Sequence, residues 1–161
     1  MRIGILSDSH GRTAKVRDAV ARLDARGVDL FVHCGDVGDA DVFEIFVGRP
    51  FRFVWGNCDL PSPPLLAFLH ATALTVPAHP PLRFNADGAS VAVFHGHEPG
   101  FAAAMARPDA DYLLHGHTHV RRDERRGTCR VINPGAIHRA SPPSAAWLDT
   151  GTDELIFIDL A

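Results

Sequence analysis

Five short apolar runs recur along the chain, and none is long enough for a typical helix. They are rich in Val, Ile, Leu and Phe, and polar or glycine-containing segments separate them. Continuous apolar runs of this length are typical of strands that are buried on both faces of a sheet. We therefore predict buried strands over residues 2–6, 29–33, 51–55, 90–95 and 111–115.

Some of the segments between these runs have a helical spacing instead. Residues 11–27 carry apolar side chains at roughly helical intervals, which favours a helix that stops at Gly27. We predict a second helix over residues 39–48 and a third, shorter one over residues 100–108. Strands that alternate with helices predict parallel strands joined by crossover helices.

The later part of the chain changes to strands joined by short turns. Two strand-like runs flank an Asp-Gly pair within residues 83–94, a pattern typical of a hairpin. Further strands are expected over residues 129–135, 144–150 and 154–160, and proline-rich loops over residues 61–64, 77–81 and 142–143. The predicted fold is α/β, with two mixed β-sheets packed as a sandwich and flanked by helices, in a single domain covering residues 1–161.

The composition is that of an ordinary globular protein, with 46% hydrophobic and 22% charged residues. A net charge of −3 argues against a general nucleic-acid binder. No apolar stretch approaches the roughly 18–20 residues of a membrane span, and the first apolar run is too short for a signal peptide. The odd number of cysteines (Cys34, Cys58 and Cys129) indicates reduced thiols, so we expect a cytoplasmic location.

Side chains that can bind metals follow each of the five predicted strands. They are Asp8, His10, Asp36, Asn57, Asp59, His95, His97, His117 and His119. Ligands of open α/β sheets bind at the carboxyl ends of the strands. Each short motif alone is more typical of a turn or a surface loop, and Asp39 is interpreted as a helix cap. A fold that brings five such loops to one edge would instead form a metal site.

The ordered set Asp-x-His, Gly-Asp, Gly-Asn, His and Gly-His-x-His resembles the calcineurin-like metallophosphoesterases. The "GNCD" at residues 56–59 and the "NPG" at residues 133–135 resemble the small single-domain bacterial and archaeal phosphodiesterase branch. The resemblance extends from residue 3 to about residue 137 and so covers most of the chain.

This resemblance implies a binuclear metal centre in which Asp36 bridges two divalent ions. One ion would be bound by Asp8, His10, Asp36 and His119, and the other by Asp36, Asn57, His95 and His117. Asp36 and Asn57 are the expected catalytic residues within the set. Imidazole and carboxylate ligands without a thiolate suit Mn, Fe, Zn or Ni, and the resemblance favours Mn.

The function implied is hydrolysis of phosphodiesters of small molecules by a metal-bridging hydroxide. A phosphomonoesterase or a nucleotide pyrophosphohydrolase with the same metal site is an alternative. A further alternative is a Vps29-like protein-binding scaffold without catalysis, against which the complete ligand set argues. The physiological substrate, the native metal and the oligomeric state stay open, and no membrane partner is expected.

Several residues outside the ligand set need a separate interpretation. Cys58 stands where the broader family has a histidine, and we interpret it as a spacer that leaves the site without the usual acid. Asp59 is expected to orient the loop of Asn57. His97 and His138 are candidates for substrate contact or proton transfer. The residues after "NPG" read "AIHRASPPS" and depart from the serine and proline–arginine pair that is common in the small branch.

Overall fold

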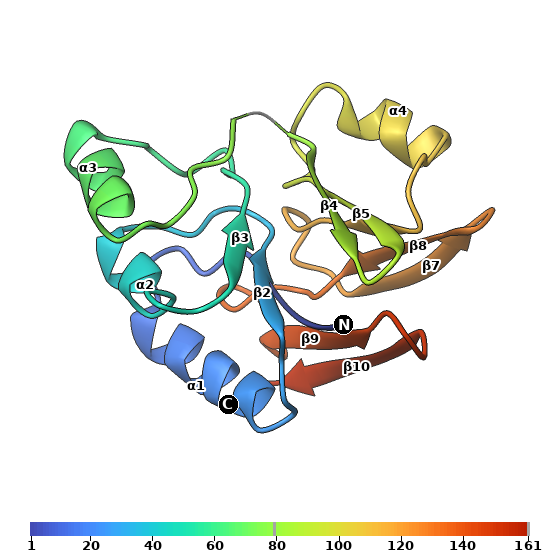
Figure 1. Cartoon of the computed structure of the whole chain (residues 1–161), viewed down its shortest axis with the longest axis horizontal. Coiled ribbons are helices and arrows are strands. Elements are labelled where there is room, and N and C mark those ends of the chain that lie inside the picture. The colour runs from blue at the N-terminus through green and yellow to red at the C-terminus, as the bar shows by residue number, and fades with distance from the viewer. Residues whose placement is uncertain (79, 161) are drawn as a thin grey trace.

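The structure, a computed structural model, describes residues 1–78 and 80–160 and contains two five-stranded sheets (Figure 1). The first sheet has the strand order β10-β9-β1-β2-β3 and the second the order β4-β5-β6-β8-β7. The strands of the first sheet are β1 (Arg2–Leu6), β2 (Leu30–His33), β3 (Phe51–Phe53), β9 (Ser144–Asp149) and β10 (Glu154–Asp159). Those of the second are β4 (Leu82–Ala86), β5 (Ala89–Val93), β6 (Tyr112–Leu114), β7 (Arg122–Arg126) and β8 (Cys129–Asn133).

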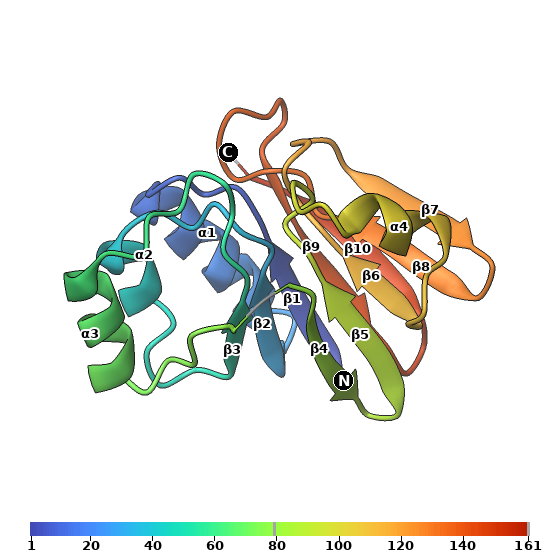
Figure 2. The ribbon, with the colours of Figure 1, turned by 90° about the horizontal axis from the view of Figure 1, so that it is seen from above.

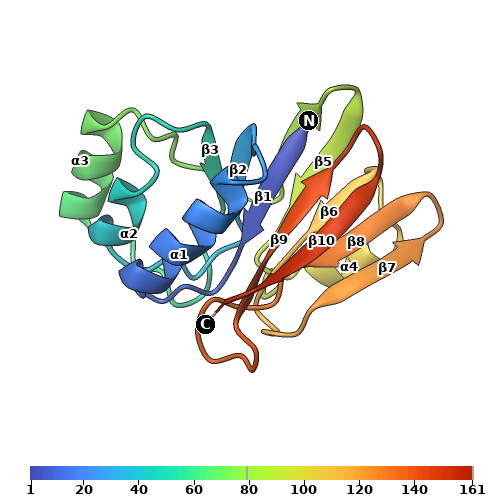
Figure 3. The ribbon, with the colours of Figure 1, turned by 90° about the horizontal axis from the view of Figure 1, so that it is seen from below.

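Both sheets are mixed and contain three neighbouring parallel strands. In the first sheet these are β1, β2 and β3, while β9 pairs antiparallel with β1 and β10 pairs antiparallel with β9 (Figure 3). In the second sheet β5, β6 and β8 are parallel, and β4 and β7 are antiparallel edge strands. The ends of the parallel strands in each sheet therefore lie along one edge of that sheet.

The two sheets pack face to face, with helices on the outer face of each (Figure 2). Successive side chains of a strand point to opposite faces, and β1 shows the consequence. Ile3 and Ile5 pack between the sheets against Leu114 of β6, whereas Leu6 packs toward the helices together with Phe31 of β2. The inner strands are thus buried on both faces, which explains their continuous apolar sequences.

The helices are α1 (Thr13–Asp24), α2 (Ala40–Glu44), α3 (Pro63–Ala71) and α4 (Phe101–Ala106). The first three cover the outer face of the first sheet, and α4 covers the second (Figure 2). Helix α1 buries Val16, Val20 and Leu23, the residues whose spacing predicts the helix.

The structure confirms the predicted fold class and all of the predicted strands, including the hairpin of β4 and β5 around Asp87-Gly88. Three elements differ from the sequence analysis. The proline-rich segment 61–64 is not only a loop, because α3 begins at Pro63 after Ser62, whose side chain accepts a hydrogen bond from the Leu65 backbone N–H. Strand β7 has no apolar pattern because it is a charged edge strand that needs to bury only one side.

The helix predicted over residues 39–48 is also shorter than expected and spans Ala40–Glu44.

No helix within residues 1–78 and 80–160 combines the length and apolar character needed to cross a membrane. The three cysteines are free thiols, with Cys34 and Cys129 buried and Cys58 exposed.

Candidate metal centre

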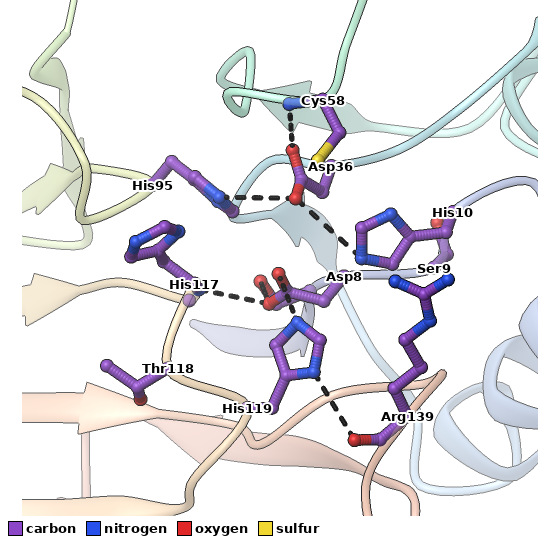
Figure 4. A network of polar contacts seen from close by, with 12 residues as sticks. Asp8, Ser9, His10, Asp36, Cys58, His95, His117, Thr118, His119 and Arg139 are labelled. Atoms are coloured by element: carbon purple, nitrogen blue, oxygen red, sulfur yellow. Dashed lines mark hydrogen bonds and ion pairs between the residues drawn. The ribbon is translucent and has the colours of Figure 1, made fainter.

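The predicted ligands come from five loops that follow strands of both sheets. Asp8 and His10 follow β1, Asp36 follows β2, Asn57 follows β3, His95 follows β5, and His117 and His119 follow β6. The loops of the two sheets meet, because the backbone N–H of His117 donates to Asp8 Oδ2 at 3.1 Å across 109 residues of sequence. Figure 4 shows His10, His95, His117 and His119 gathered around the two carboxylates.

Asp36 is buried at the centre of this cluster. Its Oδ1 accepts a hydrogen bond from the Cys58 backbone N–H at 2.8 Å. Its Oδ2 lies 3.5 Å from Nε2 of His95 and 3.7 Å from Nε2 of His10. Burial acts to raise the pKa of Asp36, but His95 and the Cys58 N–H outweigh it and hold that pKa below its usual range. One carboxylate oxygen therefore stands between imidazoles that belong to different sheets.

Asp8 is also buried but uses its two oxygens differently. Oδ2 accepts hydrogen bonds from Ser7 Oγ at 2.5 Å and from the His117 backbone N–H. Oδ1 is buried with no hydrogen-bond donor among the described residues, although Nε2 of His119 lies 3.2 Å away. Nε2 of His10 is likewise buried without a partner.

These orphaned atoms test whether the residues fit a metal. A buried polar atom without a hydrogen bond is costly, and a bound cation would satisfy an orphaned carboxylate oxygen and imidazole nitrogen together. Ligand atoms of Asp8, His10 and His119 lie within 4.8 Å of one another, as do those of Asp8, Asp36 and His95. The donor set of carboxylates and imidazoles therefore fits divalent transition-metal ions.

Backbone carbonyls fix the orientation of two of the histidines. Nδ1 of His95 donates to the Cys34 carbonyl at 2.7 Å, and Nδ1 of His119 donates to the Arg139 carbonyl at 3.4 Å. Each ring therefore presents Nε2 to the carboxylates, which is the arrangement that outer hydrogen bonds impose on metal-binding histidines. Glu98 fixes the loop of His95 by accepting from the backbone N–H groups of His95 and Gly96, both at 2.7 Å.

Most of the predicted ligands have an unusual backbone conformation. Asp8, His10, Asp36, His117 and His119 have φ values of 54°, 45°, 53°, 67° and 58°. Residues other than glycine rarely adopt this left-handed region, and such strain gathers at functional sites. The surrounding loops thus hold the ligands in conformations that cost energy.

Two glycines are required by the close approach of these loops. A Cβ atom on Gly56 would lie 2.0 Å from Asp36 Oδ1, and one on Gly116 would lie 1.8 Å from Ser7 Oγ. Neither position can carry a larger side chain without displacing a group that contacts a carboxylate.

The structure brings Cys58 and Asp59 to the Asp36 side of the site. Cys58 is exposed, and its Sγ lies within 4.8 Å of the ligand atoms of His10 and Asp36. Desolvation and the Asp36 carboxylate raise the pKa of the Cys58 thiol, whereas divalent cations would act in the opposite direction. Asp59 accepts from the backbone N–H of Gly56 at 2.8 Å and of Gly38 at 2.9 Å, so it ties the Asn57 loop to the loop after β2.

Asn57 and His97 lie beside His95. Oδ1 of Asn57 is 3.1 Å from Nε2 of His95, so its amide faces the ligand cluster. The exposed His97 ring lies 5.3 Å from the ring of His95. Among the described residues, neither His97 nor the predicted ligand His117 belongs to a group of converging ligand atoms. Asp39 is the N-cap residue of α2, as predicted, but its side chain makes no capping hydrogen bond.

Sequence reasoning did not single out Ser7, Glu98 or Arg139 as supports of the ligands. Ser7 is next to Asp8 in "SDSH", which is the one local signal available, while the contacts of Glu98 and Arg139 depend on loop geometry.

His33 is buried next to the ligand loops and contacts the loop after β1 through Ser9. Ser9 Oγ donates to the Val37 carbonyl at 2.8 Å and accepts from His33 Nε2 at 2.9 Å. Burial lowers the pKa of His33 to about 3, so the ring is neutral.

A groove of about 510 Å³ opens beside the ligand cluster. His10 and Cys58 form its inner end, and Asp39, Leu60 and Leu65 line it farther out. Leu60 is 81% exposed, which is unusual for a large apolar side chain at the mouth of a polar site.

The chain is similar to known phosphoesterases over nearly its full length. A family described as the calcineurin-like phosphoesterase superfamily domain matches residues 1–153. Phosphodiesterase MJ0936 of Methanocaldococcus jannaschii is 26% identical over 159 residues, which cover 96% of each chain. The solved structure of an archaeal phosphodiesterase has a TM-score of 0.87 at 27% identity and covers 99% of this chain and 100% of that one.

The fold also occurs in a protein of another class. Wild-type Vps29 of Entamoeba histolytica, solved in complex with Zn²⁺, has a TM-score of 0.67 at 16% identity and covers 99% of both chains. At this identity the likeness concerns the fold alone.

Proposed function

The chain belongs to the calcineurin-like phosphoesterase superfamily, and from that premise we propose that it is a binuclear metal-dependent phosphodiesterase. The observation that carries the proposal is the position of Asp36 Oδ2, between Nε2 of His95 and Nε2 of His10. A carboxylate oxygen placed between imidazoles of two sheets suits a ligand that two metal ions share.

We assign the ligands as the motifs indicate. Asp8, His10, Asp36 and His119 hold one ion, and Asp36, Asn57, His95 and His117 hold the other. The orphaned atoms Asp8 Oδ1 and His10 Nε2 support the first set. Mn²⁺ is the proposed native metal, with Fe, Zn or Ni as alternatives that this donor set also accepts.

The metals and the chain have separate tasks in the reaction. Two divalent cations, when bound, supply a water of lowered pKa as the nucleophile and neutralise the charge that develops on the phosphoryl oxygens. Ser7 and the His117 N–H hold Asp8 in place, and the Cys58 N–H holds Asp36. The Cys34 and Arg139 carbonyls keep His95 and His119 in the tautomer that presents Nε2.

Cys58 does not serve as a general acid that protonates the leaving alcohol. A thiol near two cations favours the thiolate and so does not retain a proton to donate. We therefore propose that aryl esters, whose alcohols leave as stable anions, are cleaved far better than alkyl esters. The groove at His10, Cys58 and Leu60 supports this geometry, because it gives the leaving group an exit beside the thiol.

The alternatives differ in what the loaded protein does. A phosphomonoesterase would prefer monoesters, whereas a scaffold would bind metal and hydrolyse nothing. Metal binding alone does not separate enzyme from scaffold, because Vps29 of Entamoeba histolytica was solved with Zn²⁺. We propose a small-molecule phosphate ester as the substrate and the cytoplasm as the location, supported by the free thiols of Cys34, Cys58 and Cys129.

The test combines metal analysis with a substrate panel. Exhaustive chelation should abolish hydrolysis of bis(p-nitrophenyl) phosphate, and Mn²⁺ should restore it together with two bound ions per chain. The rate on this diester should exceed the rate on p-nitrophenyl phosphate. Full activity of the stripped protein would overturn the metal mechanism. A protein that binds two ions but hydrolyses no ester would be a scaffold.

A further inference from the structure

Three positive side chains at one side of the metal centre lack a carboxylate partner. Most arginines of the chain pair with an aspartate or glutamate, as Arg130 does with both Asp123 and Asp153. No ion pair within residues 1–78 and 80–160 involves Arg12, Lys15 or Arg139. We call these three residues the cationic rim.

The cationic rim is attached to the loops that carry metal ligands. Arg12 follows His10 by two residues, and its backbone N–H donates to the Ser9 carbonyl at 2.9 Å. Lys15 lies one turn farther along α1, on the same face as Arg12. The Arg139 carbonyl accepts the hydrogen bond of His119, and Figure 4 shows the Arg139 side chain extending alongside His10.

The loop after β8 contacts the loop that carries His10. The backbone N–H of His138 donates to the Asp8 carbonyl at 3.1 Å, and the His138 ring lies 6.1 Å from the ring of His10. Arg139 follows His138 directly and Arg12 follows His10 by two residues, so positive residues of two adjoining loops lie beside the metal centre.

Among residues 1–78 and 80–160, no acidic side chain forms an ion pair with these three residues. The first turn of α1 contains no acidic residue, and the carboxylate of Asp39, which lies next to Gly11, pairs with none of the three. Asp8 and Asp36 face the metals, whose four positive charges exceed their two negative ones. Like charges on adjoining loops repel each other, and a bound anion would offset that repulsion.

We propose that the cationic rim binds a second phosphate group of the substrate, next to the phosphoryl group at the metal centre. The inference rests on the proposed function and narrows it to phosphodiesters that carry a further phosphate. Arginine suits this role because its guanidinium is always charged and donates two parallel hydrogen bonds to phosphate. The groove lined by Leu60 and Leu65 would take the uncharged substituent.

The test uses two esters that differ in one phosphate. These are thymidine 5′-(p-nitrophenyl phosphate) and the same ester with a 3′-phosphate. For the Mn²⁺-loaded wild-type protein, we expect kcat/KM to be about tenfold or more higher on the ester with the 3′-phosphate. Arg12→Ala and Arg139→Ala should each reduce this ratio, and the double variant should bring it close to one.

A control and a second readout separate binding from damage to the site. Arg26→Ala removes another exposed arginine that has no ion pair, at the far end of α1, and should keep the wild-type ratio. Calorimetry should show that thymidine 3′,5′-bisphosphate binds about tenfold more tightly than thymidine 5′-monophosphate, and that Arg139→Ala loses this difference. Arg139→Lys should retain part of it.

The outcomes distinguish the two proposals. A loaded protein that cleaves no ester contradicts the proposed function itself. Hydrolysis of both esters at equal kcat/KM, with no effect of the variants on the ratio, contradicts the cationic rim alone. Equal losses on both esters in Arg139→Ala would also overturn it, because the side chain would then act on the metal centre and not on a second phosphate.

Discussion

The loops after β1 and β2 place the two buried aspartates, Asp8 and Asp36, in equivalent positions with different surroundings. The strands are parallel neighbours, and both aspartates adopt left-handed backbone conformations, with φ of 54° and 53°. Asp8 has one oxygen occupied by donors of the chain and one oxygen free. Asp36 has one oxygen on the Cys58 N–H and the other between two imidazoles.

The comparison teaches that the neighbours, not the position in the fold, decide the role of each carboxylate. Under the proposed ligand assignment, Asp8 would bind one metal, because its second oxygen already accepts hydrogen bonds from Ser7 and His117. Asp36 would be shared, because its Oδ2 lies between imidazoles of both sheets. Four predictions test or sharpen this difference, from the largest expected effect to the smallest.

Replacing the shared carboxylate should have the largest effect. Asp36→Asn should lose about a hundredfold to a thousandfold or more in kcat/KM and at least one bound metal, because a neutral amide cannot bridge two cations. Asp8→Asn should lose one metal and retain more activity. Metal analysis and diester kinetics measure both effects, with circular dichroism to verify the fold. Two tightly bound ions in an active Asp36→Asn protein would refute the assignment.

Removing the donor to Asp8 should have an intermediate effect. Ser7→Ala leaves Asp8 Oδ2 with only the His117 N–H, and loss of such a support typically costs 10–100-fold, so we expect metal affinity to fall by about that much. Ser90→Ala is the matched control, because its hydroxyl also donates to an aspartate, Asp111 Oδ2 at 2.7 Å, but contacts no ligand carboxylate. Titration of the stripped proteins with Mn²⁺ compares them. Equal affinities in the two variants would show that Ser7 does not support Asp8.

Acid should destabilise the fold through His33, which contacts Ser9 in the loop after β1. His33 has a folded-state pKa of about 3 because of burial, below its unfolded value of 6.5, so the unfolded chain binds the proton first. Its contribution to stability is complete above pH 6.5 and is lost as pH falls toward 3, by up to about 1.4 kcal/mol per pH unit. His115, whose pKa burial lowers to about 4, should add to the slope.

This effect is measured on the metal-free protein by urea unfolding between pH 7 and pH 5. His33→Leu should unfold with a shallower pH dependence than the wild type. His70→Gln changes an exposed histidine of α3 and serves as the control that keeps the wild-type slope. If the free energy of unfolding depends on pH equally in the wild type and in His33→Leu, then the lowered pKa of His33 does not contribute to the loss of stability in acid.

The thiol beside Asp36 should matter least. The backbone N–H of Cys58, and not its sulfur, holds Asp36, so Cys58→Ala keeps the contact. A general acid contributes about 10²–10⁴-fold, and we expect a loss well below that lower limit, with aryl esters still preferred over alkyl esters. Cys58→His should improve hydrolysis of alkyl esters. A hundredfold loss on an alkyl diester in Cys58→Ala, with both metals bound, would make the thiol catalytic.

Much of the fold was predictable because the inner strands are buried on both faces. Runs such as residues 2–6 and 111–115 are apolar without interruption for that reason, and the hairpin carries its own Asp-Gly turn signal. Helix α3 was missed because prolines usually mark loops, although Ser62 followed by Pro63 is also a typical helix start. Strand β7 was missed because its alternating charges pair along a sheet edge. A single domain over residues 1–161 stays a prediction.

The candidate site was predictable in its ligand types but not in its supports. Aspartates and histidines directly after strands carry a local signal, as Asp8 and Asp36 do. The contact of Glu98 with the His95 loop and that of the Arg139 carbonyl with His119 carry none, because they arise from how separate loops meet. The unequal surroundings of the two carboxylates are likewise a property of the packed molecule.

The origin of the ligands in both sheets has a consequence for the order of events in folding. Asp8 and His117 are 109 residues apart in the chain, and their contact forms only after the two sheets have docked. A nascent chain that has completed only β1, β2 and β3 holds Asp8, His10, Asp36 and Asn57 but none of the histidines of the second sheet. Metal loading is therefore expected to come last in the maturation of the protein. Under the proposed ligand assignment, the bound ions would join loops of the two sheets, and we expect removal of the ions to speed the separation of the two layers.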